Sequence, residues 1–357
     1  MAKKPRSKKN SELFFQLPRV WKWRIGAAIF LILLLWSSWK IIGQDNTRFR
    51  ASHYYFYVRS GMEADQAAEI LEERKIIYSA WSVKLYAKIF NIVGLKPGLY
   101  RIEEGSGNYG IMRSLHAIPI RDLQRLEVMP FRKRDNMISN LCRQAGVDEK
   151  EFLKLLKNEK FLKKRGYNPE SVYCLFIPGQ VMLEKPINAE TLFEAVLDHY
   201  LFIWTDERLD MADRLGLEPH EVMILSSIVY SETKSIPEMP IVAGVYLNRL
   251  RIDMRLESDP TLVHANKAYG IQRLRDKHKR IDSPYNTYRK KGLPPGPVNT
   301  VPEWVIDPVL NAQDHQYLYF CAKPGGDGEH LFAENYAEHR KNARRYQNSL
   351  ERKGIVR

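Results

Sequence analysis

An apolar run close to the N-terminus limits how the rest of this chain can fold. Residues 25–42 read IGAAIFLILLLWSSWKII and contain one charged residue, Lys40. A helix of that length rises about 27 Å, close to the thickness of a bilayer's hydrocarbon core. Tryptophans flank the run and no small-residue cleavage site follows it, so an uncleaved anchor is favoured over a signal peptide. We therefore expect a single-pass membrane helix over residues 25–43.

The distribution of charge favours one orientation of that helix. The net charge is +14, and the first 24 residues contain eight Lys or Arg residues against one Glu. Basic flanks stay in the cytoplasm, so residues 1–24 are expected to form a cytoplasmic tail of an inner-membrane protein whose remainder is periplasmic or extracytoplasmic. Half of the positive excess lies in this tail, and the basic run at 273–280 lacks interleaved aromatics. The sequence therefore does not favour nucleic acid as a partner.

The exported part begins with a pattern typical of a small α+β module. Residues 53–58 are dense in aromatic and β-branched side chains and predict a strand. Residues 64–71 have helical apolar spacing, residues 99–102 predict a second strand, and residues 109–115 predict a short helix. We place this module at residues 44–120. The complete chain is expected to be α+β.

Two further regions follow the module. Residues 121–205 have mostly helical periodicity and are expected to form a mainly helical middle region. Residues 206–357 are expected to form a mixed α/β domain that carries the chemistry. In this domain, HEVMILSSIVYSET and IVAGVYLNRLR predict two helices, a Pro-, Gly- and Asn-rich segment follows, YLYFCA predicts a strand, and a basic helix ends the chain.

Glu232 is the strongest candidate for a catalytic group. It stands at the end of a predicted helix, ahead of two turn-rich segments well supplied with Asn, Asp and Tyr. One acid beside neutral hydrogen-bonding groups suits sugar chemistry, which needs a carboxylic acid whose pKa is raised. The helix C-terminus and an apolar setting would both raise it. Glu257 and Asp259 are candidate second acids, so the inverting and retaining alternatives both stay open.

Other reaction classes lack their motifs. The histidines have no metal-ligand spacing, no HExxH or GxSxG is present, and PGGDGEH lacks the Lys-Ser/Thr of a phosphate loop. We expect neither a metal nor a cofactor. The three cysteines, Cys142, Cys174 and Cys321, have no CxxC spacing and are expected to be buried, inert thiols, although the first two could pair.

Several segments, in the same order, carry a family resemblance. They are ILSSIVYSET, VAGVYLNRLRIDMRLESDPT, SPYNTY, GLPPGP, YLYF and the later Gly328-x-His330-x-Phe332. With them the chain resembles the YceG-like family of endolytic murein transglycosylases, single-pass membrane enzymes that cleave nascent peptidoglycan glycan strands. The resemblance implies that Glu232 is the catalytic acid and base, and that residues 44–120 are a LysM-like module. It also implies that the enzyme cleaves the glycosidic bond between MurNAc and GlcNAc and leaves 1,6-anhydroMurNAc ends. Peptidoglycan synthases are the partners that the resemblance implies.

We expect the substrate groove to be lined by polar residues from the turn-rich segments. These are Asn248, Asp259, Tyr285, Asn286, Thr287 and Tyr288. A hydrolase that uses water and a cell-wall binding protein without turnover are the alternatives.

The chain departs from the family pattern in three places. Tyr230 stands where many members have a second Glu; since positions two apart on a helix point about 200° away from each other, we expect only one of Tyr230 and Glu232 to face the cleft. Gly179-Gln180-Val181 replaces the usual Asp-Thr-Tyr after Pro, and Met129-Pro130-Phe131 replaces the usual Pro-Glu-Gly. The last two changes put substrate contacts from the middle region in question.

Overall fold

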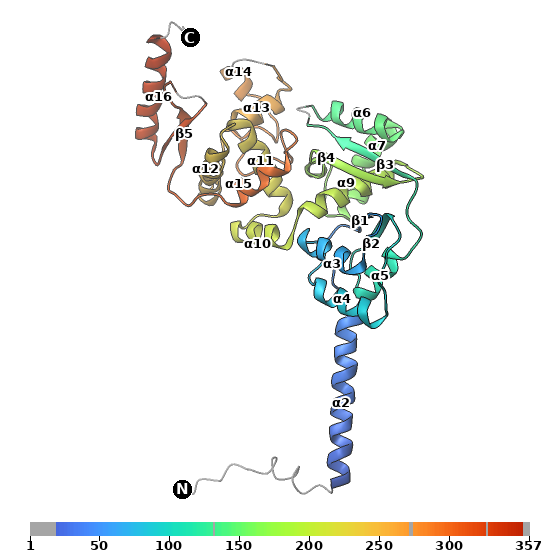
Figure 1. The fold of residues 1–357 in the computed structure, drawn as a ribbon. Helices are drawn as coiled ribbons and strands as arrows, with labels where there is room; N and C mark the ends of the chain where they lie inside the picture. The colour runs from blue at the N-terminus through green and yellow to red at the C-terminus, as the bar shows by residue number, and fades with distance from the viewer. Residues whose placement is uncertain (1–18, 131–132, 271–273, 326–327, 353–357) are drawn as a thin grey trace, which may run out of the picture. The chain divides into compact units, whose positions relative to one another are not determined.

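The computed structural model describes residues 19–130, 133–270, 274–325 and 328–352 (Figure 1). The chain divides into two compact units, Met1–Arg121 and Asp122–Arg357. Helices and antiparallel strand pairs occur in both, so the expected α+β class is confirmed. Most of the expected cytoplasmic tail, residues 1–18, lies outside the described residues.

The first unit begins with helix α2 (Arg19–Ile42) and continues as an α+β module. Strand β1 (His53–Val58) pairs antiparallel with β2 (Gly98–Glu103), with Phe56 opposite Tyr100. Helices α3 (Ala64–Glu73) and α4 (Ala80–Ile89) connect the two strands, and α5 (Asn108–Leu115) follows. Alternate strand residues and one face of each helix are buried together, which is the packing that the apolar periodicity predicts. The two strands and the helices at 64–71 and 109–115 are thus confirmed.

All of the expected membrane span, residues 25–43, except its last residue falls within α2. Among the residues whose placement is described, no helix combines the length and the apolar character needed to cross a bilayer, so the span is not confirmed.

The second unit opens with a strand pair that the sequence did not indicate. Strand β3 (Leu123–Val128) pairs antiparallel with β4 (Gly179–Glu184), placing Leu126 opposite Val181. The helical elements of this region are α6 (Arg134–Ala145), α7 (Glu149–Leu156), α8 (Glu159–Lys163), the 3-10 turn η1 (Ser171–Leu175) and α9 (Ala189–Ile203). Helices predominate in this region, as expected, but its two strands pair with each other across most of the helical elements.

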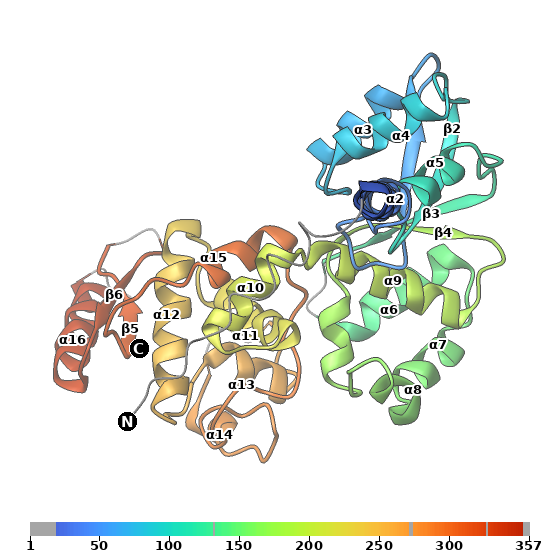
Figure 2. The same cartoon turned by 90° about the horizontal axis from the view of Figure 1, so that it is seen from below.

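The rest of this unit is built around two buried helices, α11 (Pro219–Glu232) and α12 (Met239–Arg251) (Figure 2). The elements around them are α10 (Asp206–Leu215), η2 (Ile236–Glu238), α13 (Asp259–Ala265), α14 (Asp276–Lys279), η3 (Glu303–Val305), α15 (Ile306–Leu310) and α16 (Tyr336–Arg352). Strands β5 (Tyr319–Ala322) and β6 (His330–Ala333) form a third antiparallel pair. The expected strand at 317–322 and the final basic helix are confirmed.

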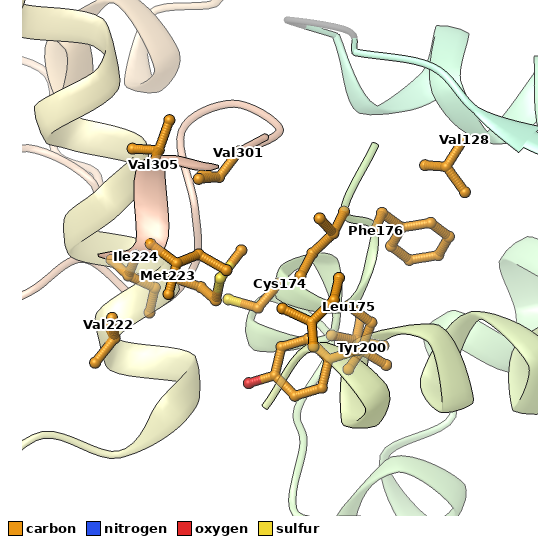
Figure 3. Packing of buried hydrophobic residues seen from close by; sticks show 14 of the residues in the cluster. Val128, Cys174, Leu175, Phe176, Tyr200, Val222, Met223, Ile224, Val301 and Val305 are labelled. Carbon is orange, nitrogen blue, oxygen red and sulfur yellow. The ribbon is translucent and has the colours of Figure 1, made fainter. Parts of the chain in front are cut away.

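One apolar core joins the two halves of the second unit. Every residue of α11 from Val222 to Val229 is buried, and an apolar surface all around a helix is typical of a helix at the centre of a core. Figure 3 shows Cys174 and Leu175 of η1 directed toward Met223 and Ile224 of α11. The Cys174 thiol lies 3.5 Å from the carbonyl oxygen of His220. Cys142 and Cys174 are free and buried, as expected, whereas Cys321 is free but only partly buried, so the expectation of burial is wrong for it.

Candidate active site

The position of Glu232 follows from how α11 begins and ends. Pro219 occupies the first turn, and Glu218 and Glu221 form a capping box, so the N-terminal amides are satisfied. At the other end, Thr233 adopts an extended conformation (φ −130°, ψ 146°) and stops the helix. Glu232 is therefore the last helical residue, as the sequence predicts. Its carboxylate lies at the point where the buried helix reaches the surface.

Two hydroxyl groups hold the Glu232 carboxylate. The hydroxyl of Tyr246 on α12 and the Oγ of Ser258 both donate to Oε1, each at 2.8 Å. Ser258 is itself fixed, because its backbone amide donates to the Oγ1 of Thr287 at 3.0 Å. The same Thr287 oxygen lies 2.7 Å from the Oγ1 of Thr261. Two segments thus converge on one carboxylate oxygen, and a third, at Thr287, holds one of them in place.

The surroundings of Glu232 favour its protonated form. Burial is the largest influence and raises the pKa of the carboxyl above its ordinary value, because a charged group loses hydration there. The hydrogen bonds from Tyr246 and Ser258 act in the opposite direction, since both stabilise the carboxylate. The nearby charge of Asp259 adds to the upward shift of the pKa and that of His330 opposes it. Such a group can hold a proton closer to neutral pH than an exposed Glu.

A pocket of about 440 Å³ lies beside this carboxyl. Its walls combine neutral polar groups, apolar surface and two charged side chains besides Glu232. The lining residues are Pro130, Tyr230, Ser231, Glu232, Lys234, Asp259, Pro260, Val263, Tyr269, Val298, Asn299 and Thr300. This mixture suits an uncharged, hydroxyl-rich ligand better than an anion or a metal ion.

Both Tyr230 and Glu232 line the pocket, so the expectation that only one of them could face the cleft is wrong. The angular argument holds within a helix, but α11 ends at Glu232 and the chain turns away at Thr233. The pocket wraps around the end of the helix and reaches positions on more than one side of it.

Asp259 and Tyr288 are the groove candidates that the structure brings close to Glu232. Asp259 begins α13 and lines the pocket. The Tyr288 hydroxyl donates to Oδ1 of Asp259 at 2.7 Å. Burial raises the pKa of Tyr288, and the charge of Asp259 raises it further, so the phenol remains a donor. Glu257, the other candidate second acid, is exposed and is not among the lining residues.

The four remaining candidates make contacts within the protein, and none is among the residues that line the pocket. Asn248 donates from Nδ2 to the carbonyl oxygens of His315 (2.7 Å) and Tyr317 (3.1 Å). Asn286 is fully buried and donates to the carbonyl oxygens of Lys279 and Ile281. Thr287 holds Ser258. Their role as direct substrate contacts stays a prediction.

Tyr285 joins the middle region to the pocket wall. Its hydroxyl accepts from Nη2 of Arg134 and donates to Oε2 of Glu170, each at 2.6 Å. Arg134 also donates to the carbonyl oxygen of Pro297 at 2.9 Å, next to the lining residues Val298 to Thr300. The backbone at Gly296 passes so close to the backbone at Glu170 that only glycine fits, since a Cβ at Gly296 would lie 2.4 Å from the Glu170 carbonyl oxygen.

The middle-region departures from the family pattern fall in different places. Gly179, Gln180 and Val181 open strand β4 and are not among the lining residues. Pro130 does line the pocket, and Phe131 lies outside the described residues.

The buried carboxylate of Glu238 also supports the end of α11. Glu238 accepts the hydroxyl of Thr233 at 3.1 Å on Oε2 and the backbone amide of His330 at 2.7 Å on Oε1. The Nδ1 of His330 lies 3.0 Å from Oε2. The residue after Glu232 is thereby tied to strand β6.

Sequence reasoning missed Tyr246 and Ser258. Tyr246 occupies an apolar stretch of α12, where the sequence indicates a core aromatic, and Ser258 stands between two more conspicuous acids. Within the ranges that the structure describes, no cluster of three or more His, Cys, Asp or Glu side chains could hold a metal ion.

Known proteins resemble this chain over most of its length. A Bacillus subtilis protein named endolytic murein transglycosylase is 25% identical over 315 residues, covering 83% of this chain and 85% of that protein. A Streptococcus pneumoniae protein of the same name is 25% identical over 321 residues, covering 82% of this chain and 58% of that protein. A crystal structure of a yceG-like protein from Listeria monocytogenes aligns with a TM-score of 0.49 and 23% identity, covering 81% of this chain and 98% of that chain. Residues 56–345 match the model of the YceG-like family, and the chain therefore belongs to that family.

Proposed function

We propose that this protein is an endolytic lytic transglycosylase that cleaves peptidoglycan glycan strands between MurNAc and GlcNAc. The observation that carries the proposal is the Glu232 carboxyl, whose pKa is raised by burial beside a pocket lined by both neutral polar and apolar groups. The names of the relatives from Bacillus subtilis and Streptococcus pneumoniae support the same activity. A lytic transglycosylase is a lyase, and its cut terminates a growing strand.

The reaction needs one carboxyl that acts first as acid and then as base. Protonated Glu232 gives its proton to the oxygen between MurNAc C1 and the following GlcNAc, and the C1–O bond breaks. Positive charge develops at C1 and the ring oxygen. The MurNAc 6-hydroxyl oxygen then bonds to C1, and its proton passes to the Glu232 carboxylate. The products are a GlcNAc 4-hydroxyl and a 1,6-anhydroMurNAc end, and no water is consumed.

The protein's own groups divide the work at Glu232. Tyr246 and Ser258 both donate to Oε1, which fixes the carboxyl plane and stabilises the charge formed after the first proton transfer. Among the described residues no hydrogen bond reaches Oε2, which is therefore the oxygen available to hold and transfer the proton. Asp259, oriented by Tyr288, contributes to the groove wall and supports the protonated state of Glu232 through its charge.

The decisive experiment is digestion of purified peptidoglycan with the full-length protein, followed by mass spectrometry of the products. We expect ends lighter by one water than those of hydrolysis. Glu232→Gln should abolish cleavage without loss of folding. Glu257→Gln, which changes an exposed acid outside the pocket, is the matched control and should cleave like the wild type.

Three results would overturn the assignment. Products with only reducing ends would identify a hydrolase that uses water. Unchanged cleavage by Glu232→Gln would remove Glu232 from the chemistry, and no cleavage by the wild type would favour a cell-wall binding protein.

We further propose that residues 25–43 anchor the protein in the inner membrane and that residues 44–120 are a LysM-like module facing the cell wall, where synthases extend the strands. The apolar run and its basic flank support the anchor, and the βααβ order of the module supports the second assignment. Membrane fractionation of the full chain and of a chain that starts at Gln44 tests the anchor. Recovery of both in the soluble fraction would contradict it.

A further inference from the structure

An exposed tryptophan contacts one of the residues that line the pocket. Trp304 in η3 has 46% of its surface exposed. Its ring meets that of Tyr230 edge to face, with centroids 5.7 Å apart and planes at 85°. Since Tyr230 lines the pocket beside Glu232, this contact places the exposed indole of Trp304 next to the pocket. We refer to Tyr230 and Trp304 as the aromatic shelf.

The backbone that carries Trp304 is held rigidly. Arg208, on α10, donates from Nη1 to Glu303 at 2.9 Å. The same guanidinium donates from Nε and Nη2 to the two carboxylate oxygens of Asp307, both at 2.8 Å. One arginine therefore clamps the chain on either side of Trp304, while Val305 beside it is fully buried. A large ring on a fixed support loses little conformational entropy when a ligand covers it.

The other half of the shelf is also fixed. The Nζ of Lys234 lies 3.9 Å from the centroid of the Tyr230 ring and donates to the Tyr230 carbonyl oxygen at 2.9 Å. A cation at that distance covers part of the ring and restricts its motion. Tyr230 thus supports the shelf, and the exposed indole of Trp304 provides its open surface. Many members of the family that the sequence resembles carry Glu where this chain has Tyr230.

We propose that the aromatic shelf is a sugar-binding subsite, on which a ring of the glycan strand next to the cleaved disaccharide stacks against Trp304. The inference rests on the proposed function, because an endolytic cut requires the strand to continue out of the pocket on both sides of the broken bond. The apolar C–H face of a pyranose carries partial positive charge and complements the negative face of an indole. The shelf starts at the pocket and offers that face.

Binding and kinetics test the subsite with separate readouts. In a Glu232→Gln background, Trp304→Ala should weaken binding to purified glycan strands freed of stem peptides by about threefold to tenfold, the range expected for one aromatic contact. In the active protein, the same substitution should raise KM for long strands by that factor and lower kcat less than twofold. Trp304→Phe should recover most of the loss. Ile252→Ala, which truncates a 59% exposed apolar side chain at the end of α12, is the control and should change neither quantity.

The possible failures are distinguishable. Wild-type affinity and KM in Trp304→Ala, with cleavage still dependent on Glu232, would overturn the subsite and leave the proposed function standing. Equal losses in the Phe and Ala variants with a lowered Tm would also overturn it, since they would indicate a structural role. If the wild type does not cleave at all, the proposed function fails, and the binding measurement in the Glu232→Gln background still decides whether the shelf holds glycan.

Discussion

Glu232 is a residue whose ionisation opposes folding. Burial raises its pKa in the folded chain above the ordinary value that it has when unfolded. The folded protein therefore binds the proton more tightly, and the stability contributed by this group is complete below the unfolded pKa and is lost as pH rises through the folded pKa. The raised pKa of Glu232, which suits its proposed role as an acid, thus reduces the free energy of unfolding at higher pH.

This linkage predicts that Glu232→Gln stabilises the protein at alkaline pH. The Gln amide keeps an acceptor oxygen for Tyr246 and Ser258 but cannot ionise. The Tm of the Glu232→Gln variant should therefore exceed the wild-type Tm at pH 8. The difference should shrink as pH falls toward the ordinary range of a Glu carboxyl. Thermal unfolding followed at several pH values measures it, and Glu257→Gln at the exposed site should show no such trend. A constant difference in Tm across pH would contradict the linkage.

Tyr246→Phe should shift the pH profile of cleavage. The lost hydroxyl stabilises the Glu232 carboxylate, so its removal raises the pKa of Glu232 further. Because the free enzyme must be protonated to start the reaction, the decline of kcat/KM at high pH should move to higher pH. Loss of one charge-assisted hydrogen bond should also lower kcat on the order of tenfold. Wild-type kcat and an unmoved profile would show that Tyr246 does not position the acid.

The sequence predicted that Glu232, the proposed acid, ends a helix, but it did not indicate the two hydroxyl groups that contact it. The end of a buried helix is visible in the apolar pattern of 222–229, so Glu232 could be placed. Asn286 and Thr287 belong to the expected polar segment, yet they are buried and bond to backbone atoms and to Thr261. Composition cannot distinguish a polar side chain that fixes a loop from one that faces a ligand, because both occur in turn-rich segments.

At the scale of elements, the end of α11 is held by a hairpin that is distant in sequence. Glu238 links Thr233 to His330 of β6. The neighbouring strand contributes Phe320, whose ring meets Tyr246 edge to face with centroids 5.9 Å apart. The β5–β6 hairpin therefore supports both Glu232 and one of the hydroxyls that hold it.

Removing the Glu238 carboxylate should loosen this arrangement. Glu238→Ala leaves three donors without their acceptor in a buried place, and we expect a loss of about 2–4 kcal/mol in the free energy of unfolding. Cleavage should fall as well, because the residue that follows Glu232 is no longer fixed. Denaturant unfolding and product analysis measure the two effects. Glu329→Ala, which removes an exposed acid from the same hairpin region, should match the wild type; equal behaviour of both variants would rule out a special role for Glu238.

Elements with a strong local signal were predictable, and those that depend on distant partners were not. The aromatic and β-branched run at 53–58 predicts β1 within its observed bounds. The β3–β4 pair joins Leu123–Val128 to Gly179–Glu184 across four helical elements. Neither strand has a run of aromatic and β-branched residues like the one at 53–58. A pairing over that sequence distance is determined by tertiary packing.

At the scale of the whole molecule, the proposed chemistry belongs to one unit. Pocket residues from Pro130 to Thr300 and the supports at Glu238 and His330 all fall within Asp122–Arg357, whose apolar core extends from Leu126 to Leu310. A chain of residues 122–357 should therefore fold and cleave soluble glycan strands with kcat within about threefold of the full-length value. Circular dichroism and product analysis test this, with Glu232→Gln in the short chain as the inactive reference. A folded but inactive short chain would show that the first unit takes part in the chemistry.

Both hydroxyls that hold Glu232 remain donors whether the opposite oxygen carries a proton or not. Glu232 can then change between its acid and base forms by gaining or losing a proton on Oε2, and no heavy atom has to move. Donors arranged in advance add no reorganisation barrier to the step. Cleavage of short strands should accordingly need no loop motion and should survive immobilisation of the protein in a crystal lattice.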